Sequence, residues 1–62
     1  MFSEFIGQKI KYVTIDEDGE EATMGEVLTE VEGTLIKVKA PSGKVTIINT
    51  AASNFFKLEL MN

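Results

Sequence analysis

The sequence predicts an all-β fold in which five short strands form one strongly bent small β-barrel, preceded by a short N-terminal helical turn. Between its glycine and proline breaks the chain consists of runs rich in Val, Ile, Thr and Phe, which favour strands. Beyond the first six residues no segment repeats its apolar residues with the 3.6-residue period of a helix. A length of 62 residues fits a single small domain spanning 1–62.

The elements follow in order from these breaks. The first six residues, MFSEFI, are expected to form the helical turn, with Ser3 as N-cap and with Phe2, Phe5 and Ile6 covering one end of the barrel. The expected strands are QKIKYVTID (8–16), ATMGEVLTEVE (22–32), TLIKVKA (34–40), KVTIINT (44–50) and FFKLEL (55–60).

Gly25 lies inside the second run, where a strand glycine marks a bulge or a sharp bend. A long, bent second strand can serve both halves of a small barrel. An open five-stranded sheet would expose two edges, so we expect a nearly closed barrel of the SH3 or OB kind.

Alternation along each strand predicts which side chains face the core. The expected core comprises Ile10, Tyr12, Thr14, Val27, Thr29, Val31, Ile36, Val38, Ala40, Phe56, Leu58 and Leu60. Five apolar side chains are left on the outer face, which is many for so small a barrel and predicts a partner surface. These candidate oligomer-interface residues are Val13, Ile15, Leu28, Leu35 and Phe55.

The composition excludes several classes of site. The chain has no Cys and no His, and therefore no disulfide, no thiolate zinc site and no histidine base. It also lacks G-x-S-x-G, S-x-x-K and phosphate-loop patterns, so we expect no enzyme, no catalytic residues, no cofactor and no metal. Self-association is the remaining support for so small a core, which predicts a homo-oligomer.

The net charge of −4, with six lysines and no arginine, argues against strong phosphate-driven binding of nucleic acid. No apolar run approaches the roughly 20 residues that cross a bilayer. The N-terminus also lacks the basic region of a signal peptide, so a cytoplasmic location without membrane contact is expected.

Half of the ten acidic residues lie in DEDGEE, residues 16–21. A calcium loop starting at Asp16 would need glycine at its sixth position and glutamate at its twelfth, where the chain has Glu21 and Val27. Asp18-Gly19 instead predicts the turn of a β-hairpin, with glycine at positive φ. Since its carboxylates repel phosphate, nucleic acid should bind elsewhere.

FIGQKIKYVTI, the acidic turn and MGEVLTEVEGTLIKV together resemble the first motif of Sm and LSm proteins. The matching positions are Gly7, Ile10, Tyr12, Gly19, Gly25, Val27, Leu35 and Val38. The resemblance implies the small barrel with its N-terminal helical turn, association with RNA, and rings in which strand four of one subunit pairs with strand five of the next.

The chain departs from that family at the RNA pocket. The turn Val31-Glu32-Gly33-Thr34 lacks the family's Asn, and Ile48-Asn49-Thr50 followed by Ala51-Ala52 stands where a basic residue and glycine are expected. The uridine pocket of the family therefore does not carry over.

Two sets of residues are candidates for binding nucleic acid. Lys9, Lys11, Lys37 and Lys39 could track phosphates, with Tyr12 or Phe55 stacking on bases; alternatively they are solvent-exposed lysines that discourage edge pairing. In a ring, the loop with Asn49, Thr50, Ser53, Asn54 and Phe55 would face the pore; alternatively its polar groups bond to local backbone, with Ala51-Ala52 as a short 3₁₀ turn. The sequence thus predicts a non-enzymatic Sm-like ring associated with RNA or other nucleic acid, with an SH3-like protein-interaction adaptor or a structural subunit as alternatives.

Overall fold

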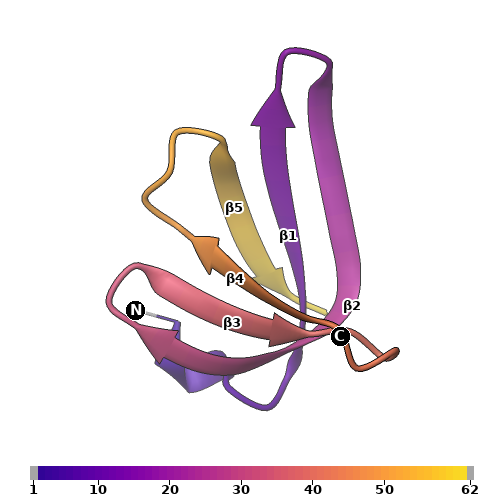
Figure 1. Ribbon diagram of the computed structural model, residues 1–62, viewed down its shortest axis with the longest axis vertical. Helices are drawn as coiled ribbons and strands as arrows, with labels where there is room; N and C mark the ends of the chain where they lie inside the picture. The colour runs from indigo at the N-terminus through magenta and orange to yellow at the C-terminus, as the bar shows by residue number, and fades with distance from the viewer. Residues whose placement is uncertain (1, 62) are drawn as a thin grey trace.

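The computed structural model describes residues 2–61 and is all-β (Figure 1). The elements are η1 (Ser3–Phe5, a 3₁₀ turn), β1 (Lys9–Asp16), β2 (Gly19–Glu32), β3 (Leu35–Lys39), β4 (Val45–Asn49) and β5 (Phe55–Leu60). The strands pair antiparallel in one sheet of order β4-β3-β2-β1-β5. The predicted five strands and the N-terminal helical turn are confirmed. Within the described residues β4 and β5 are edges that do not pair with each other, so closure into a barrel is not shown.

The long strand β2 bends sharply and serves both halves of the sheet (Figure 1). Its first part pairs with β1, and from Val27 onward it pairs with β3. Gly25 is skipped in the β1 pairing and has a φ of 87°, which confirms the predicted bend at this glycine. Thr29 is skipped in the β3 pairing and forms a second bulge.

The core lies inside the bend. Four side chains are at most 1% exposed, and Tyr12 joins them at 9%; the four are Ile10, Leu28, Ile36 and Val38. Partly buried apolar side chains pack against this cluster from β2, β4, β5 and the N-terminal turn: Phe2, Phe5, Val31, Ile48, Phe55, Leu58 and Leu60. No helix within residues 2–61 has the length and apolar character needed to cross a bilayer.

Three predicted outward side chains are covered in the structure. Leu28 belongs to the core, because the bulge at Thr29 lets both Leu28 and Val31 face inward although they are three residues apart. Val13 is 3% exposed, since it lies on β1 between β2 and β5. Phe55 is half-buried against the core. The outward assignment of these three residues is therefore wrong.

The predicted inward position of Val27 is also wrong, because Val27 lies opposite the outward Lys9 and Lys39 and lines a hollow with them. So is that of Phe56, whose side chain is 52% exposed. Phe56 is skipped between the pairs Val13–Lys57 and Thr14–Phe55, so this bulge exchanges the faces of the two adjacent phenylalanines.

The N-terminal turn differs from the prediction in its cap. The N-cap of η1 is Phe2, with no side-chain cap hydrogen bond, so Ser3 is not the N-cap. The Phe2 and Phe5 rings lie 6.2 Å apart and pack against the core as expected, whereas Ile6 is 45% exposed and covers nothing.

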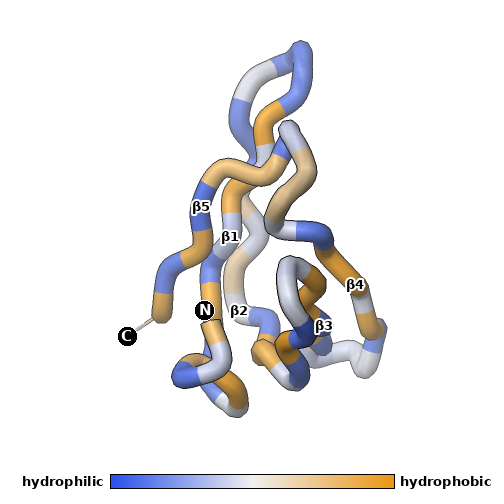
Figure 2. The backbone as a smooth tube through the Cα atoms, turned by 90° about the vertical axis from the view of Figure 1, so that its left-hand side faces the viewer, coloured by the Kyte–Doolittle hydropathy of each residue, from blue (hydrophilic) through white to orange (hydrophobic). Residues whose placement is uncertain are grey.

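The acidic stretch forms the predicted β-hairpin, but its turn lies one residue earlier than the predicted Asp18-Gly19. Asp16 pairs with Gly19, so Glu17 and Asp18 form the turn, and Gly19 has a φ of 115°. The Asp18 N–H donates to Asp16 Oδ1 at 2.8 Å, which closes the turn locally. This tip projects from the rest of the molecule and is strongly hydrophilic (Figure 2).

Candidate functional site

The free edge of β4 is the first candidate surface. β4 reads VTIIN and pairs only with β3 among the described strands, in a continuous register. Its outward side chains Val45 and Ile47 are 52% and 64% exposed, and Figure 2 shows the apolar character of this segment. The strand has no charge, no proline and no bulge, which are the devices that usually protect an exposed edge. We refer to Val45–Asn49 as the bare edge.

The opposite edge, β5, is partly protected. It carries Lys57 and Glu59, whose side chains lie 3.6 Å apart, and it contains the bulge at Phe56. The Lys57 ammonium lies 5.8 Å from the centroid of the exposed Phe56 ring. This edge therefore offers one apolar side chain and two opposite charges to a partner.

The predicted interface residues separate in the structure. Leu35 is 43% exposed and lies beside the bare edge, opposite Asn49. Ile15 is 39% exposed but lies near the hairpin tip, and the other three are buried or half-buried as described above. The prediction missed Val45, Ile47 and Phe56. Alternation along the uncharged residues VTIINT (45–50) would have identified the first two, whereas nothing in the sequence marks the bulge that exposes Phe56.

A hollow of about 390 Å³ lies beside the β4–β5 loop and is lined by Phe2, Thr34, Thr50, Ala51, Phe55 and Phe56. We call it the loop hollow. It brings together two predicted nucleic-acid residues, Thr50 and Phe55, and adds two aromatic rings that the sequence did not assign to this loop. Three phenylalanine side chains around a polar rim form a surface on which an unstacked base can lie.

The polar groups of this loop divide into two kinds. Asn49 Oδ1 accepts from the Ala51 N–H at 3.0 Å, and Thr50 Oγ1 donates to Thr34 O at 2.8 Å. These two side chains hold the local backbone, as the structural alternative predicts. Ser53 and Asn54 are exposed and form no side-chain hydrogen bond with another residue of 2–61, so their polar groups are available to a ligand.

The Ala51-Ala52 segment lies in a turn closed by the Ala52 N–H, which donates to Asn49 O at 3.1 Å. The predicted turn is present at this position. It fixes the path of the loop past the loop hollow.

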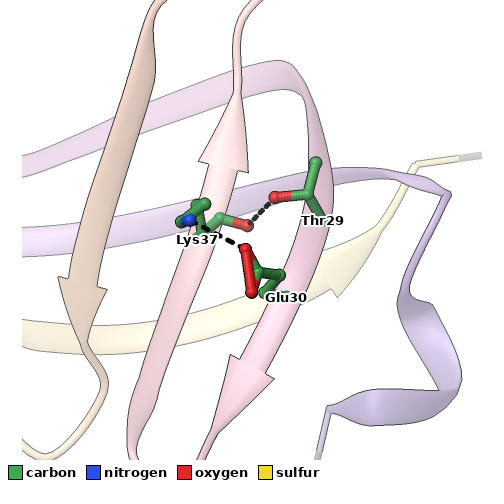
Figure 3. A network of polar contacts seen from close by, with 3 residues as sticks. All are labelled: Thr29, Glu30 and Lys37. Carbon is green, nitrogen blue, oxygen red and sulfur yellow. Dashed lines mark hydrogen bonds and ion pairs between the residues drawn. The ribbon is translucent and has the colours of Figure 1, made fainter.

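The four predicted lysines do not form one stripe. Lys37 Nζ lies 2.7 Å from Glu30 Oε2, and the Thr29 hydroxyl donates to Lys37 O at 3.1 Å (Figure 3). The charge of Lys37 is therefore balanced on its own surface. Lys11 is half-buried on β1 and lines neither the loop hollow nor the two hollows described below.

Lys9 and Lys39 do come together, although they are distant in sequence. Both are exposed and line a hollow of about 370 Å³ on the outer side of the bend. Its other lining residues are Gly25, Val27, Thr29, Ala40 and Pro41. Among residues 2–61 no acidic side chain lines this hollow, which we call the lysine hollow.

A third hollow, of about 200 Å³, adjoins the bare edge and is lined by Glu30, Glu32, Leu35, Ile36, Lys37 and Ile47. Because Glu30 is paired with Lys37, Glu32 leaves this hollow with a net negative charge, unlike the lysine hollow. The outer surface thus has an acidic region beside β4 and a basic region at the bend of β2.

Tyr12 is not available for base stacking, because it is only 9% exposed and belongs to the core. Its hydroxyl donates to Glu26 Oε1 at 2.9 Å. Burial, followed by this hydrogen bond to Glu26, raises the pKa of Tyr12 above its usual value of 10.0.

No cluster of three or more acidic side chains within residues 2–61 is arranged to hold a metal ion. Comparison of the chain with family models, with curated proteins and with solved structures returned no match.

Proposed function

We propose that this chain is a non-enzymatic Sm-like module of the small-barrel type, which assembles into a homo-oligomeric ring and associates with single-stranded RNA. In the ring, β4 of one subunit pairs with β5 of the next. The observation that carries the proposal is the bare edge: an uncharged, unbulged edge strand with two exposed apolar side chains.

Edge pairing between subunits accounts for features that a monomer leaves unexplained. A bare edge exposes a row of unpaired backbone groups and is a template for another strand. The two sheet edges are different strands, so head-to-tail pairing uses one β4 and one β5 in every subunit. When subunits joined by such heterologous contacts close into a ring, no β4 or β5 edge is left unpaired. A symmetric β4–β4 dimer would leave both β5 edges unpaired.

The association with RNA is supported by the loop hollow. Its three phenylalanines offer stacking surfaces, which are worth about 1–3 kcal/mol per base. Ser53 and Asn54, next to it in the chain, have hydroxyl and amide groups suited to the edges of unpaired bases. The resemblance to Sm proteins favours RNA among the nucleic acids.

The assembly is tested by light scattering and sedimentation over a range of protein concentrations. A ring gives one defined multiple of the 6.8 kDa subunit mass that persists on dilution. A clean monomer at micromolar concentration overturns the ring.

RNA association is tested by titrating labelled oligo(U) and oligo(A) at roughly 50 mM salt, where phosphate contacts are strong. The variant Phe56→Leu keeps an apolar side chain at the β5 edge and removes one ring from the loop hollow. We expect it to weaken binding without changing the oligomer mass. The RNA proposal fails if the wild-type chain shows no binding under these conditions.

A protein-interaction adaptor is the second candidate, favoured by the acidic hollow beside the bare edge. An extended peptide from another protein could add to β4 in place of a second subunit, with a basic side chain near Glu30 and Glu32. A monomeric chain that binds no RNA and captures one protein after nuclease treatment would favour the adaptor over the ring.

A further inference from the structure

We propose that the lysine hollow is a phosphate site that holds one nucleotide unit of a single-stranded RNA, at a place separate from the loop hollow. This inference rests on the RNA association proposed above and specifies a second contact for the same ligand. Lys9 and Lys39 bind the phosphate, and the apolar floor of the hollow receives the adjoining sugar and base.

Strand register places the two lysines on the same face. Lys9 lies opposite Val27, and Val27 lies opposite Lys39, on three consecutive strands of the sheet. Residues directly opposite one another project to the same side, and neighbouring strands are about 4.8 Å apart. The two Cα atoms are therefore about 10 Å apart with Val27 between them, a span that two lysine side chains can bridge around one phosphate.

The charges of the hollow are not balanced by the protein. Neither Lys9 nor Lys39 has an ion-pair partner within residues 2–61, whereas Lys37 and Lys57 each have one. Two unpaired cations facing the same hollow repel each other, and a bound anion relieves that repulsion. The acidic tip, which contains half of the carboxylates in the chain, is not part of the hollow.

The remaining walls suit the carbon atoms of a nucleotide and are held in place by backbone hydrogen bonds. Val27, Ala40 and Pro41 form the apolar lining. Beside them the Ala40 N–H donates to Lys44 O and the Gly43 N–H donates to Ala40 O, both at 2.8 Å. Because this turn is closed in the unbound protein, little ordering is needed when a ligand enters.

The alternative anionic partner is a membrane surface, which the geometry does not favour. Recognition of anionic lipids uses clusters of about 4–8 basic residues on a flat or helical surface. Here two lysines face a hollow in a chain with a net charge of −4. A single compact phosphate matches this arrangement better than a charged plane.

The two hollows lie at opposite ends of β3, so one RNA strand can reach both. Thr34, just before β3, lines the loop hollow, and Lys39, the last residue of β3, lines the lysine hollow. Five residues of strand separate them, about 17 Å at the usual rise. A strand of a few nucleotides can span this distance, within the site sizes of single-strand binding barrels.

The test compares two double variants that change the net charge equally. Lys9→Gln/Lys39→Gln removes the cations of the hollow, and Lys11→Gln/Lys37→Gln removes two lysines of β1 and β3 that line neither the lysine hollow nor the loop hollow. Binding of labelled oligo(U) of roughly 12 nucleotides is measured by fluorescence anisotropy at several salt concentrations. We expect the first variant to bind about tenfold more weakly, the factor for losing a hydrogen bond to a charged group.

The salt dependence gives a second expected result. Since each phosphate contact to a single strand contributes about 0.7 to the slope of log K against log salt, losing one or two contacts lowers the slope by about 0.7–1.4. The Lys11→Gln/Lys37→Gln control and Lys9→Arg/Lys39→Arg should both stay close to wild type. The inference is overturned if the hollow variant keeps wild-type affinity and slope, or if the control loses as much.

Amide NMR with uridine monophosphate separates failure of the inference from failure of the proposed function. We expect shifts of the Lys9, Lys39 and Ala40 amides in the wild type and none in the hollow variant. If Phe56→Leu weakens RNA binding and the hollow variant does not, the proposed function stands and the inference fails. If the wild type binds no oligonucleotide, the proposed function fails, and so does the RNA assignment of the hollow. The RNA assignment of the hollow is also overturned if the chain binds anionic vesicles through both lysines but binds no RNA.

Discussion

Ile47, at the centre of the bare edge, offers the sharpest test of assembly. Its side chain is 64% exposed in the single chain. Fully burying an isoleucine contributes about 1.5–3 kcal/mol, so covering the exposed part by a neighbouring subunit contributes about 1–2 kcal/mol. Ile47→Glu removes this contribution and adds a charge of the kind that natural edge strands use against pairing. We expect each subunit interface to weaken by at least about tenfold.

The chain provides a matched control in Met24, whose side chain is 61% exposed on the inner strand β2. Ile47 lies opposite Lys37 and Met24 lies opposite Lys11, so an introduced glutamate faces a lysine on the neighbouring strand in both variants. Met24→Glu therefore repeats the change in charge, exposure and cross-strand partner at a site outside β4 and β5, the two strands that the proposed ring pairs.

Sedimentation velocity at several concentrations measures the result, with circular dichroism confirming that both variants remain folded. We expect Ile47→Glu to shift the protein toward monomer at concentrations where wild type and Met24→Glu remain assembled. Equal masses for all three proteins would refute edge pairing through β4. Equal loss of assembly in both variants would show that the added charge, and not the edge, is responsible.

Three further predictions concern the core, the tyrosine and the acidic tip. Leu28→Ala should lower the free energy of unfolding by about 2–5 kcal/mol in urea denaturation, because Leu28 is 0% exposed; a cost below about 1 kcal/mol would place it outside the core. Tyr12, the sole tyrosine, should titrate above pH 10.0 by ultraviolet absorbance. The contribution of neutral Tyr12 to the free energy of unfolding is fully present below pH 10 and is lost as the pH rises through the raised pKa, so Tyr12→Phe should not show this loss of stability at alkaline pH. A titration midpoint of Tyr12 at or below pH 10 would contradict the prediction. Replacing the glutamates of the tip by glutamine should not weaken oligonucleotide binding at about 50 mM salt, and a loss of binding would contradict our exclusion of this region; these residues are Glu17, Glu20 and Glu21.

The number of strands and their positions along the chain were predictable because the sequence signals for them are local. Gly25 and Gly19 have φ values of 87° and 115°, which non-glycine residues rarely adopt, so these glycines marked the bend and the hairpin correctly. In the rest of the chain the composition of the runs, together with the absence of a 3.6-residue apolar period, distinguished strands from helices.

The side-chain faces were less predictable, because two bulges carry no glycine. Thr29 and Phe56 are each an extra residue in their pairing, and each shifts the alternation of its strand by one. As a result Leu28 changes from an expected interface residue to the core, and Phe55 and Phe56 exchange roles. Packing between strands decides where a bulge forms at a non-glycine residue. The alternation of residues within one strand carries no information about that packing.

The candidate lysines show the same difference between local and non-local information. Their spacing within each strand allowed either a stripe of four lysines that follows phosphates or four lysines that are merely exposed to solvent. The cross-strand register instead brings Lys9 and Lys39 together and leaves Lys37 beside Glu30. Register depends on the pairing of β1, β2 and β3, so the lysine hollow becomes visible only in the folded sheet.

Assembly and RNA binding support each other physically in the proposed ring. A chain with a net charge of −4 and two unpaired lysines in one hollow is a weak RNA ligand by itself. None of the residues that line the lysine hollow belongs to β4 or β5, so edge pairing leaves the hollow open in every subunit. A ring repeats this weak site, and sites joined in one assembly bind a single strand far more tightly than one site alone. Ile47→Glu, which is remote from the lysine hollow, should therefore weaken binding to long oligonucleotides while the response of the hollow to uridine monophosphate stays unchanged.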